Sequence, residues 1–354
     1  MKKKFKIGNK LVGDGQPTFL IAEIASNHNR SKSTTKKLIE QAAESGFDAV
    51  KFQIYDAKEA FSTKEMTTDV GLDHIYGKKP WWKIAKNKIL MPREWFGEMF
   101  SYVRQVGLIP LSAIHREEDC KFLLQHKLPA IKIASIDLDY YHLQKKLIKF
   151  KLPMIVSTGM ATDTEINKTF KNLRSWGQKE LAFLHCVSLY PPKPENVHLN
   201  NIIGLKKRFN IPIGFSDHSS GTCTSVASIA LGSNIIEKHI TLDKKFPGPD
   251  HPFSIEPQEM KNMVLEIREI EKSLGNFKRK LSNNEKKNRK IVRRSIITST
   301  NIKKNHQISL ENIKFARPGK GIPTNKFYKV NGKYAKKNIS SDTILKFNML
   351  KNAK

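Results

Sequence analysis

Eight short apolar runs recur between residues 19 and 241, and each is followed by a longer segment with helical spacing. The runs are FLIAEIA (19–25), DAVKFQI (48–54), LIPLSAI (108–114), AIKIAS (130–135), PMIVSTG (153–159), LAFLHCV (181–187), IPIGFSD (211–217) and IIEKHIT (235–241). Continuous apolar runs are typical of parallel strands buried on both faces, and parallel neighbours need helical crossovers. Eight such units predict an α/β fold, a (β/α)8 TIM barrel. A doubly wound open sheet is the alternative, because the sequence does not show closure.

The chain after these units has a different pattern. We predict a catalytic barrel domain over residues 1–275, a charged linker over 276–290 and a small β-rich domain over 291–354. The linker is expected because NFKRKLSNNEKKNRK is highly charged and almost devoid of apolar residues. Within the barrel, the connection from Tyr55 to about Pro92 is abnormally long, and long connections often serve or cover a site.

The net charge of +30, from 63 Lys and Arg against 33 Asp and Glu, raises the question of whether the protein binds nucleic acid. Most of these cations are Lys spread over every segment, whereas specific phosphate and base contacts favour Arg. We therefore expect no nucleic-acid partner, although an anionic substrate would benefit from the field. No apolar run approaches the roughly 20 residues of a membrane span. Three cysteines without CxxC spacing fit a reducing cytoplasm, so we expect a cytoplasmic protein without a membrane partner.

Polar side chains interrupt the carboxyl ends of the predicted strands, where barrels carry their chemistry. They are Glu23, Lys51, Gln53, Ser112, Lys132, Ser135, Ser157, Thr158, His185, Ser188, Tyr190, Ser216, Asp217, His218, Glu237 and His239. Any one of them could be a snorkelling lysine or an ordinary polar histidine. Charged side chains buried at strand ends are costly unless they are ion-paired or bind a ligand. The set as a whole therefore predicts a ligand site.

Two lysines define the anion-binding part of this site. Lys51 and Lys132 predict a cradle for a phosphate and a carboxylate. Its hydroxyl groups are expected from Ser112, Ser135, Ser157 and Ser216.

Two histidines on neighbouring strands define a second part. His218 and His239 offer imidazoles to a divalent cation, and only two protein ligands leave an open shell suited to a Lewis acid. Asp217 either orients a histidine or caps the following helix.

Seven motifs occur in order along the strands. They are AEIASNH (22–28), KFQ (51–53), KIAS (132–135), STGM (157–160), HCVSLYP (185–191), GFSDHS (214–219) and EKHITLDKKFPGPDH (237–251). The series resembles the signature of the sialic acid synthase family, which includes pseudaminate and legionaminate synthases. KFARPGKGIP (314–323) resembles the antifreeze-like SAF domain that these enzymes carry.

The resemblance implies a phosphoenolpyruvate-dependent transferase that condenses this substrate with an open-chain N-acetylated hexosamine and releases phosphate. N-acetylmannosamine, giving N-acetylneuraminate, is the expected acceptor. Legionaminate or pseudaminate synthesis from a diacetylated hexosamine is the alternative. In a different class, the chain would be a non-catalytic sugar- or nucleic-acid-binding barrel.

The resemblance also implies residue roles. Phosphoenolpyruvate would be held by Lys51, Lys132, Ser135, Ser157, Ser188 and Ser216. The catalytic residues would be Glu23, a candidate for proton transfer, with His218 and His239 as the ligands of Mn2+ or Mg2+. Sugar contacts are implied for Gln53, Tyr190, Asp250 and Arg317. Arg317 would reach the site of the other subunit in a domain-swapped homodimer.

The third strand departs from the family pattern. Many members read STPF where this chain reads SAIH (112–115), so Ala113 replaces a hydroxyl and His115 an aromatic residue. Losing one neutral hydrogen bond costs about 1 kcal/mol, which is small beside the roughly 8 kcal/mol or more of enzymatic acceleration. We therefore expect activity to survive. Ser188 stands where some members have Asn.

Overall fold

The computed structural model describes residues 4–276 and 278–352. By its internal contacts the chain divides into two compact units, Met1–Gly275 and Asn276–Lys354. Residues 1–3 and 353–354, at the ends of the two predicted domains, and residue 277, in the predicted linker, lie outside the described residues.

Eight parallel strands of the first unit close into a barrel in the order β10, β3, β4, β5, β6, β7, β8, β9. They are β3 (Phe19–Glu23), β4 (Ala49–Ile54), β5 (Ile109–Ile114), β6 (Ile131–Ile133), β7 (Met154–Ser157), β8 (Leu181–Cys186), β9 (Ile213–Asp217) and β10 (Ile235–His239). Closure occurs where β10 pairs in register with β3. The predicted (β/α)8 barrel is confirmed, and the open sheet is excluded.

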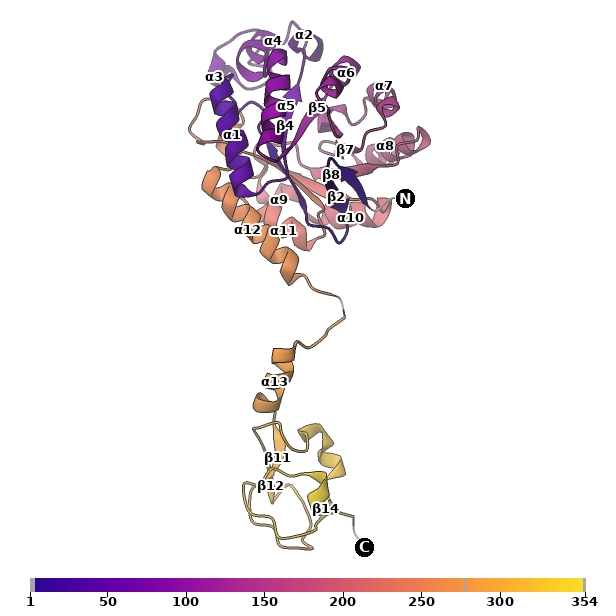
Figure 1. Cartoon of the computed structure of the whole chain (residues 1–354), viewed down its shortest axis with the longest axis vertical. Helices are drawn as coiled ribbons and strands as arrows, with labels where there is room; N and C mark the ends of the chain where they lie inside the picture. The colour runs from indigo at the N-terminus through magenta and orange to yellow at the C-terminus, as the bar shows by residue number, and fades with distance from the viewer. Residues whose placement is uncertain (1–3, 277, 353–354) are drawn as a thin grey trace. The chain divides into compact units, whose positions relative to one another are not determined.

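Helices surround the strands (Figure 1). The main ones are α1 (Lys32–Ser45), α5 (Phe96–Gln105), α6 (Glu117–Gln125), α7 (Tyr141–Leu147), α8 (Asp163–Ser175), α10 (Asn200–Phe209), α11 (Cys223–Ala230) and α12 (Pro257–Ser273). Local sequence sets their ends. In α1 the Ser31 side chain accepts a hydrogen bond from the Thr34 N–H, and Gly46 ends the helix with φ 89°, a left-handed conformation that suits glycine.

An N-terminal hairpin was not predicted from the sequence. Its strands β1 (Lys4–Ile7) and β2 (Lys10–Gly13) pair antiparallel. Phe5, Ile7 and Val12 pack against inward-facing apolar side chains near the strand starts, including Ile21 and Ile155. The barrel interior is therefore apolar at the amino ends of the strands, and the polar side chains gather toward the carboxyl ends.

The long connection after β4 has structure of its own. It contains α2 (Ala57–Ala60), α3 (Asp73–Tyr76), α4 (Trp81–Ile84) and a π-helical turn, η1 (Ala85–Ile89). Trp81, Ile84 and Leu90 form a separate small core with Ala57 and Ala85. The connection is thus a packed subdomain.

The remaining elements of the barrel unit are single turns. They are η2 (Arg93–Trp95), η3 (Ser135–Asp137), η4 (Ile148–Phe150), α9 (Pro194–Val197) and η5 (His251–Phe253). None of the helices over residues 4–276 and 278–352 is both long and apolar enough to cross a bilayer.

The second unit is small and rich in short strands. It contains α13 (Asn283–Val292), β11 (Ser295–Thr298), β12 (Ile313–Ala316), η6 (Thr324–Lys329), β13 (Tyr334–Ala335), η7 (Phe347–Met349) and β14 (Leu350–Lys351). Its core includes Ile296, Ile308 and Leu345.

Part of the predicted linker 276–290 is helical, because α13 begins at Asn283. α13 begins with a capping box in which the Ser282 side chain accepts from the Glu285 N–H and the Glu285 carboxylate accepts from the Ser282 N–H. No residue of α13 is buried. The high charge of this segment therefore belongs in part to a solvated helix.

Candidate active site

A cavity of about 450 Å3 opens at the carboxyl ends of the barrel strands. We call it the mouth. The predicted site residues among its lining are Lys51, Gln53, Lys132, Ser135, Ser157, Ser188, Tyr190, Ser216, His218, His239 and Asp250. Side chains two apart on a strand share a face, so these strands direct their alternate residues into the barrel.

Two lysines and two glutamates form one buried, ion-paired group, in which Lys51, Lys132 and Glu237 line the mouth and Glu23 lies behind its wall. Lys51 Nζ lies 2.6 Å from Glu23 Oε2 and 3.3 Å from Glu237 Oε1, and Lys132 Nζ lies 3.4 Å from the same Glu237 oxygen. All four side chains are at most 5% exposed. Lys132 Nζ also donates to Ser157 Oγ over 2.7 Å. Glu237 thus places both ammonium groups beside one oxygen atom.

These neighbours shift the protonation equilibria in different directions. Burial opposes ionisation of Glu237, but Lys132 and Lys51 outweigh it and lower its pKa to about 2. Burial is likewise outweighed at Lys51, where Glu23 and Glu237 raise the pKa of the ammonium. Burial dominates at the other two groups, lowering the pKa of Lys132 and raising that of Glu23. A proton is therefore easier to add to Glu23, and easier to remove from Lys132, than in water.

Polar contacts orient the carboxylates next to the lysines. Gln53 Nε2 donates to Glu23 Oε1 over 3.2 Å, and Ser216 Oγ donates to Glu237 Oε1 over 3.0 Å. Across the mouth, the Asp250 carboxylate accepts from Ser26 Oγ over 2.6 Å. Burial raises the pKa of Asp250.

His218 and His239 lie side by side, with ring centroids 5.3 Å apart. His218 Nδ1 lies 3.0 Å from the Val187 carbonyl oxygen, so it has its partner in the protein. His239 Nδ1 is buried without a hydrogen-bond partner in the described part of the chain. Burial, with the nearby positive charges, lowers the pKa of His239 well below its usual value, so its ring is neutral.

These two imidazoles fit a divalent cation with an open shell. A metal ligand requires a neutral ring with a free nitrogen, and His239 meets this requirement. At His218 burial lowers the pKa, but the contact with Cys186 outweighs burial and raises it, so this ring must lose its proton to bind an ion. Among residues 4–276 and 278–352, no cluster of three or more His, Cys, Asp or Glu is placed to hold an ion. Two histidines would therefore leave the other coordination positions to water or substrate.

Comparison with known proteins supplies the family. Residues 38–279 match the NeuB family, and residues 293–351 match the SAF domain. The chain belongs to the NeuB family. As a member it is a sugar acid synthase, a transferase.

Its relatives cover nearly the whole chain. It is 40% identical over 322 residues to an uncharacterised protein of Methanocaldococcus jannaschii, covering 91% of each chain. It is 36% identical to the N,N'-diacetyllegionaminic acid synthase of Campylobacter jejuni, covering 93% of this chain and 99% of the relative. The crystal structure of the N-acetylneuraminic acid synthetase of Leptospira borgpetersenii aligns with a TM-score of 0.71 and 28% identity, over 80% of this chain and 94% of that chain.

One predicted hydroxyl is absent from the mouth of this NeuB-family barrel. Ser112 Oγ donates to the Ala113 carbonyl oxygen over 3.0 Å and does not line the cavity. Leu111 belongs to the apolar cluster of the barrel interior, so the next residue faces the surrounding helices. The prediction placed Ser112 near the strand end without fixing the phase of the alternation.

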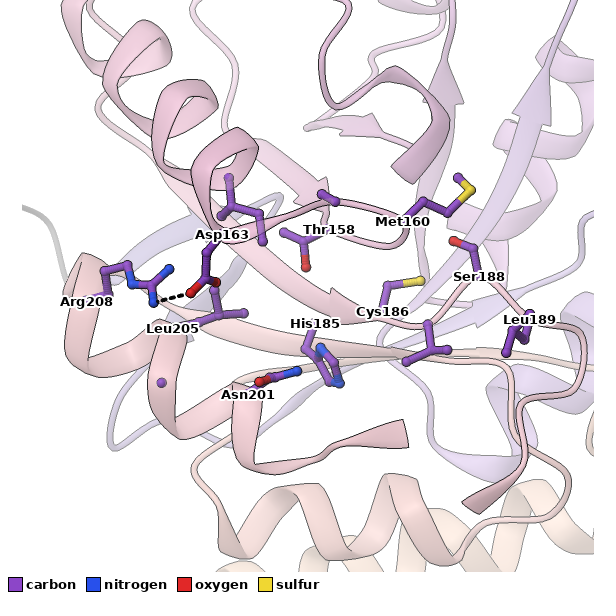
Figure 2. Close-up of a pocket in the computed structure, with 14 residues that line it drawn as sticks. Thr158, Met160, Asp163, His185, Cys186, Ser188, Leu189, Asn201, Leu205 and Arg208 are labelled. Atoms are coloured by element: carbon purple, nitrogen blue, oxygen red, sulfur yellow. Dashed lines mark hydrogen bonds and ion pairs between the residues drawn. The ribbon is translucent and has the colours of Figure 1, made fainter. Parts of the chain in front are cut away.

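His185 and Thr158 lie in a second cavity, of about 360 Å3, beside β8 (Figure 2). His185 Nε2 lies 2.7 Å from the Val197 carbonyl oxygen. Neither side chain lines the mouth. Each residue is adjacent in sequence to one whose side chain points into the barrel, so its own side chain points outward. Cys186 and Ser188 line both cavities.

One of the two unusual third-strand residues, His115, contacts the wall of the mouth. His115 Nδ1 lies 2.6 Å from Asp137 Oδ2, and its ring stacks on Tyr55 with centroids 3.7 Å apart. Tyr55 lines the mouth, whereas His115 does not. His115 therefore supports an aromatic wall residue.

Glu237 is a site residue for which the sequence predicted no role. Its position two residues before His239 was the available signal, because that spacing places both side chains inside the barrel. Arg317 follows β12 in the second unit, so its role at the mouth stays a prediction.

Proposed function

We propose that the mouth condenses phosphoenolpyruvate with an open-chain N-acetylated hexosamine to give a nine-carbon 2-keto sugar acid and phosphate. In this reaction C3 of phosphoenolpyruvate forms a bond to the aldehyde carbon, and the aldehyde oxygen takes a proton. Water adds at C2, and the bond from C2 to the phosphate ester oxygen breaks. Atoms balance with one water consumed per phosphate released.

The observation that carries the proposal is the pair of buried ammonium groups joined by Glu237. Lys51 and Lys132 face one cavity with the hydroxyls of Ser135, Ser157 and Ser216. A compact anion with a phosphate and a carboxylate suits such a cradle, in which each charge-assisted hydrogen bond contributes about 1.5–3 kcal/mol. Ser188 Oγ is buried without a partner among the described residues and is a further candidate donor.

The acceptor would lie on the other side of the mouth. Glu23, with its raised pKa, contacts two residues of the mouth, Lys51 and Gln53, and would exchange a proton with the reacting sugar. Gln53, Tyr190 and Asp250 line the mouth and offer contacts to the hydroxyl and amide groups of the sugar. His218 and His239 would hold Mn2+ or Mg2+. When bound, such an ion supplies Lewis acidity toward an aldehyde oxygen.

The acceptor's identity has two candidates. The strand motifs favour N-acetylmannosamine, and the 36% identity to a diacetyllegionaminic acid synthase favours a diacetylated hexosamine as the second candidate. The panel of acceptors comprises N-acetylmannosamine and the two diacetylated hexosamines of the legionaminate and pseudaminate routes. In the presence of phosphoenolpyruvate and Mn2+, we expect only one of these acceptors to cause release of phosphate. A colorimetric phosphate assay measures it. Absence of release with all three would refute the synthase assignment for this mouth.

We further propose that Arg317 contacts the sugar in the mouth of a second copy, as the family resemblance implies for a domain-swapped homodimer. Arg317→Ala is then expected to raise KM for the sugar about tenfold or more, because a charged hydrogen-bond donor is lost. Binding of phosphoenolpyruvate, measured by calorimetry, should stay within twofold. Wild-type sugar kinetics in the variant would contradict the assignment, and Arg294→Ala, in the same unit, is the matched control.

A further inference from the structure

Asp217 and Lys238 form an ion pair on the outer face of the barrel, directly behind the two histidines. Lys238 Nζ lies 3.0 Å from Asp217 Oδ2, and both side chains are fully buried. The two residues face each other across the β9–β10 pairing. Each immediately precedes a histidine, since His218 follows Asp217 and His239 follows Lys238.

The contacts extend to the residue on the far side of His218. Lys238 Nζ donates to the Ser219 carbonyl oxygen over 2.5 Å. Asp217 Oδ1 accepts from the Ser219 N–H over 2.8 Å and from Ser219 Oγ over 2.7 Å. Both sequence neighbours of His218 are therefore tied to the residue that precedes His239.

A second set of contacts anchors the pair to a helix. Asp217 Oδ2 accepts from Thr224 Oγ1 over 2.9 Å and from Ser225 Oγ over 2.6 Å, both in α11. None of the hydrogen bonds of Asp217 in the described residues goes to a histidine. Asp217 thus neither orients an imidazole directly nor serves only as a helix cap.

We propose that Asp217 and Lys238 are positioning residues that fix the spacing of the His218 and His239 side chains for a shared divalent cation. The inference rests on the proposed function, because it assigns the ion to these histidines. Metal–ligand distances tolerate only about 0.2 Å, and His218 lies in the loop after β9, where no strand pairing holds it. The ion pair and its bonds to Ser219 supply that restraint from outside the mouth.

If the buried ion pair only stabilised the fold, replacing both partners would leave the affinity for Mn2+ unchanged. Removing one partner leaves an uncompensated buried charge and can prevent folding, whereas neutralising both partners is far better tolerated. The informative protein is therefore the double variant Asp217→Asn with Lys238→Met. The readout is Mn2+ affinity by electron paramagnetic resonance, from the signal of free Mn2+, with phosphoenolpyruvate affinity measured by calorimetry alongside.

We expect the double variant to bind Mn2+ about ten- to a hundredfold more weakly, the range for loss of groups that orient metal ligands. Its affinity for phosphoenolpyruvate should change less than threefold, because the lysine cradle lies on the inner face. The matched control is Asp119→Asn, which removes another fully buried, ion-paired carboxylate, bound by Arg93 and Arg116 away from β9 and β10. The control should lose stability and keep wild-type Mn2+ affinity.

Three results would overturn the inference. They are wild-type Mn2+ affinity in the double variant, an equal loss of Mn2+ affinity in the Asp119→Asn control, and no Mn2+ binding by the wild type. The first two leave phosphate release by the wild-type enzyme intact. Failure of the proposed function is distinguished by the absence of phosphate release from the wild type.

Discussion

His239→Ala is expected to lower the rate of phosphate release about a thousandfold and to remove its stimulation by Mn2+. A bound cation that polarises the aldehyde is worth several kcal/mol at the transition state, and about 4 kcal/mol corresponds to three orders of magnitude in rate. His239 is buried, its pKa is lowered so that the ring is neutral, and its Nδ1 has no partner in the described chain. Steady-state phosphate release across a Mn2+ titration measures the effect.

The matched control for this prediction is His185→Gln. His185 also lies near a strand end, but it contacts the Val197 carbonyl oxygen in the second cavity. We expect this variant to keep its Mn2+ dependence even if it is less stable. Undiminished Mn2+ stimulation of His239→Ala would show that the ion binds elsewhere.

Glu23→Gln is expected to lower kcat by a factor of about 10^2 to 10^4, the usual contribution of a positioned acid or base. Affinity for phosphoenolpyruvate should change only severalfold, because Lys51 keeps its contact with Glu237. Glu266→Gln, on the exposed face of α12, is the matched control and should behave as wild type. Retention of at least half of the wild-type kcat by Glu23→Gln would remove Glu23 from the chemistry.

The pH profile adds an independent test of Glu23. Burial raises the pKa of its carboxyl above the ordinary value of 4.5 despite the nearby lysines. Glu23 therefore keeps its proton to a higher pH than a free carboxyl, and loses it as pH rises through the raised pKa. The wild-type kcat profile should show an ionisation above pH 4.5 that is missing in Glu23→Gln. The same ionisation in both proteins would assign it to another group.

The barrel could be predicted because its signal is spread over many residues. Each strand is a continuous apolar run, and eight of them in series leave few architectures. The hairpin formed by β1 and β2 was missed because each of its strands has four residues, and together they bury three apolar side chains against the barrel, those of Phe5, Ile7 and Val12. Such short segments acquire their stability from the tertiary contact, which local sequence does not encode.

The direction of the candidate side chains could be predicted where spacing fixed the phase of a strand, and their roles stay predictions. Lys51 with Gln53, and Glu237 with His239, are two apart and do share the interior. Ser112 was placed by proximity to the strand end and faces outward. The network joining Asp217, Ser219 and Lys238 was not predictable, because it depends on the register between two strands.

The most direct test of the central claim is the mass of the product formed from phosphoenolpyruvate and the acceptor that supports phosphate release. Condensation in the mouth predicts a sugar acid heavier than the acceptor by one pyruvate unit, formed in a one-to-one ratio with phosphate. Phosphate release accompanied by free pyruvate and unchanged acceptor would contradict the account, since it would show hydrolysis without carbon–carbon bond formation.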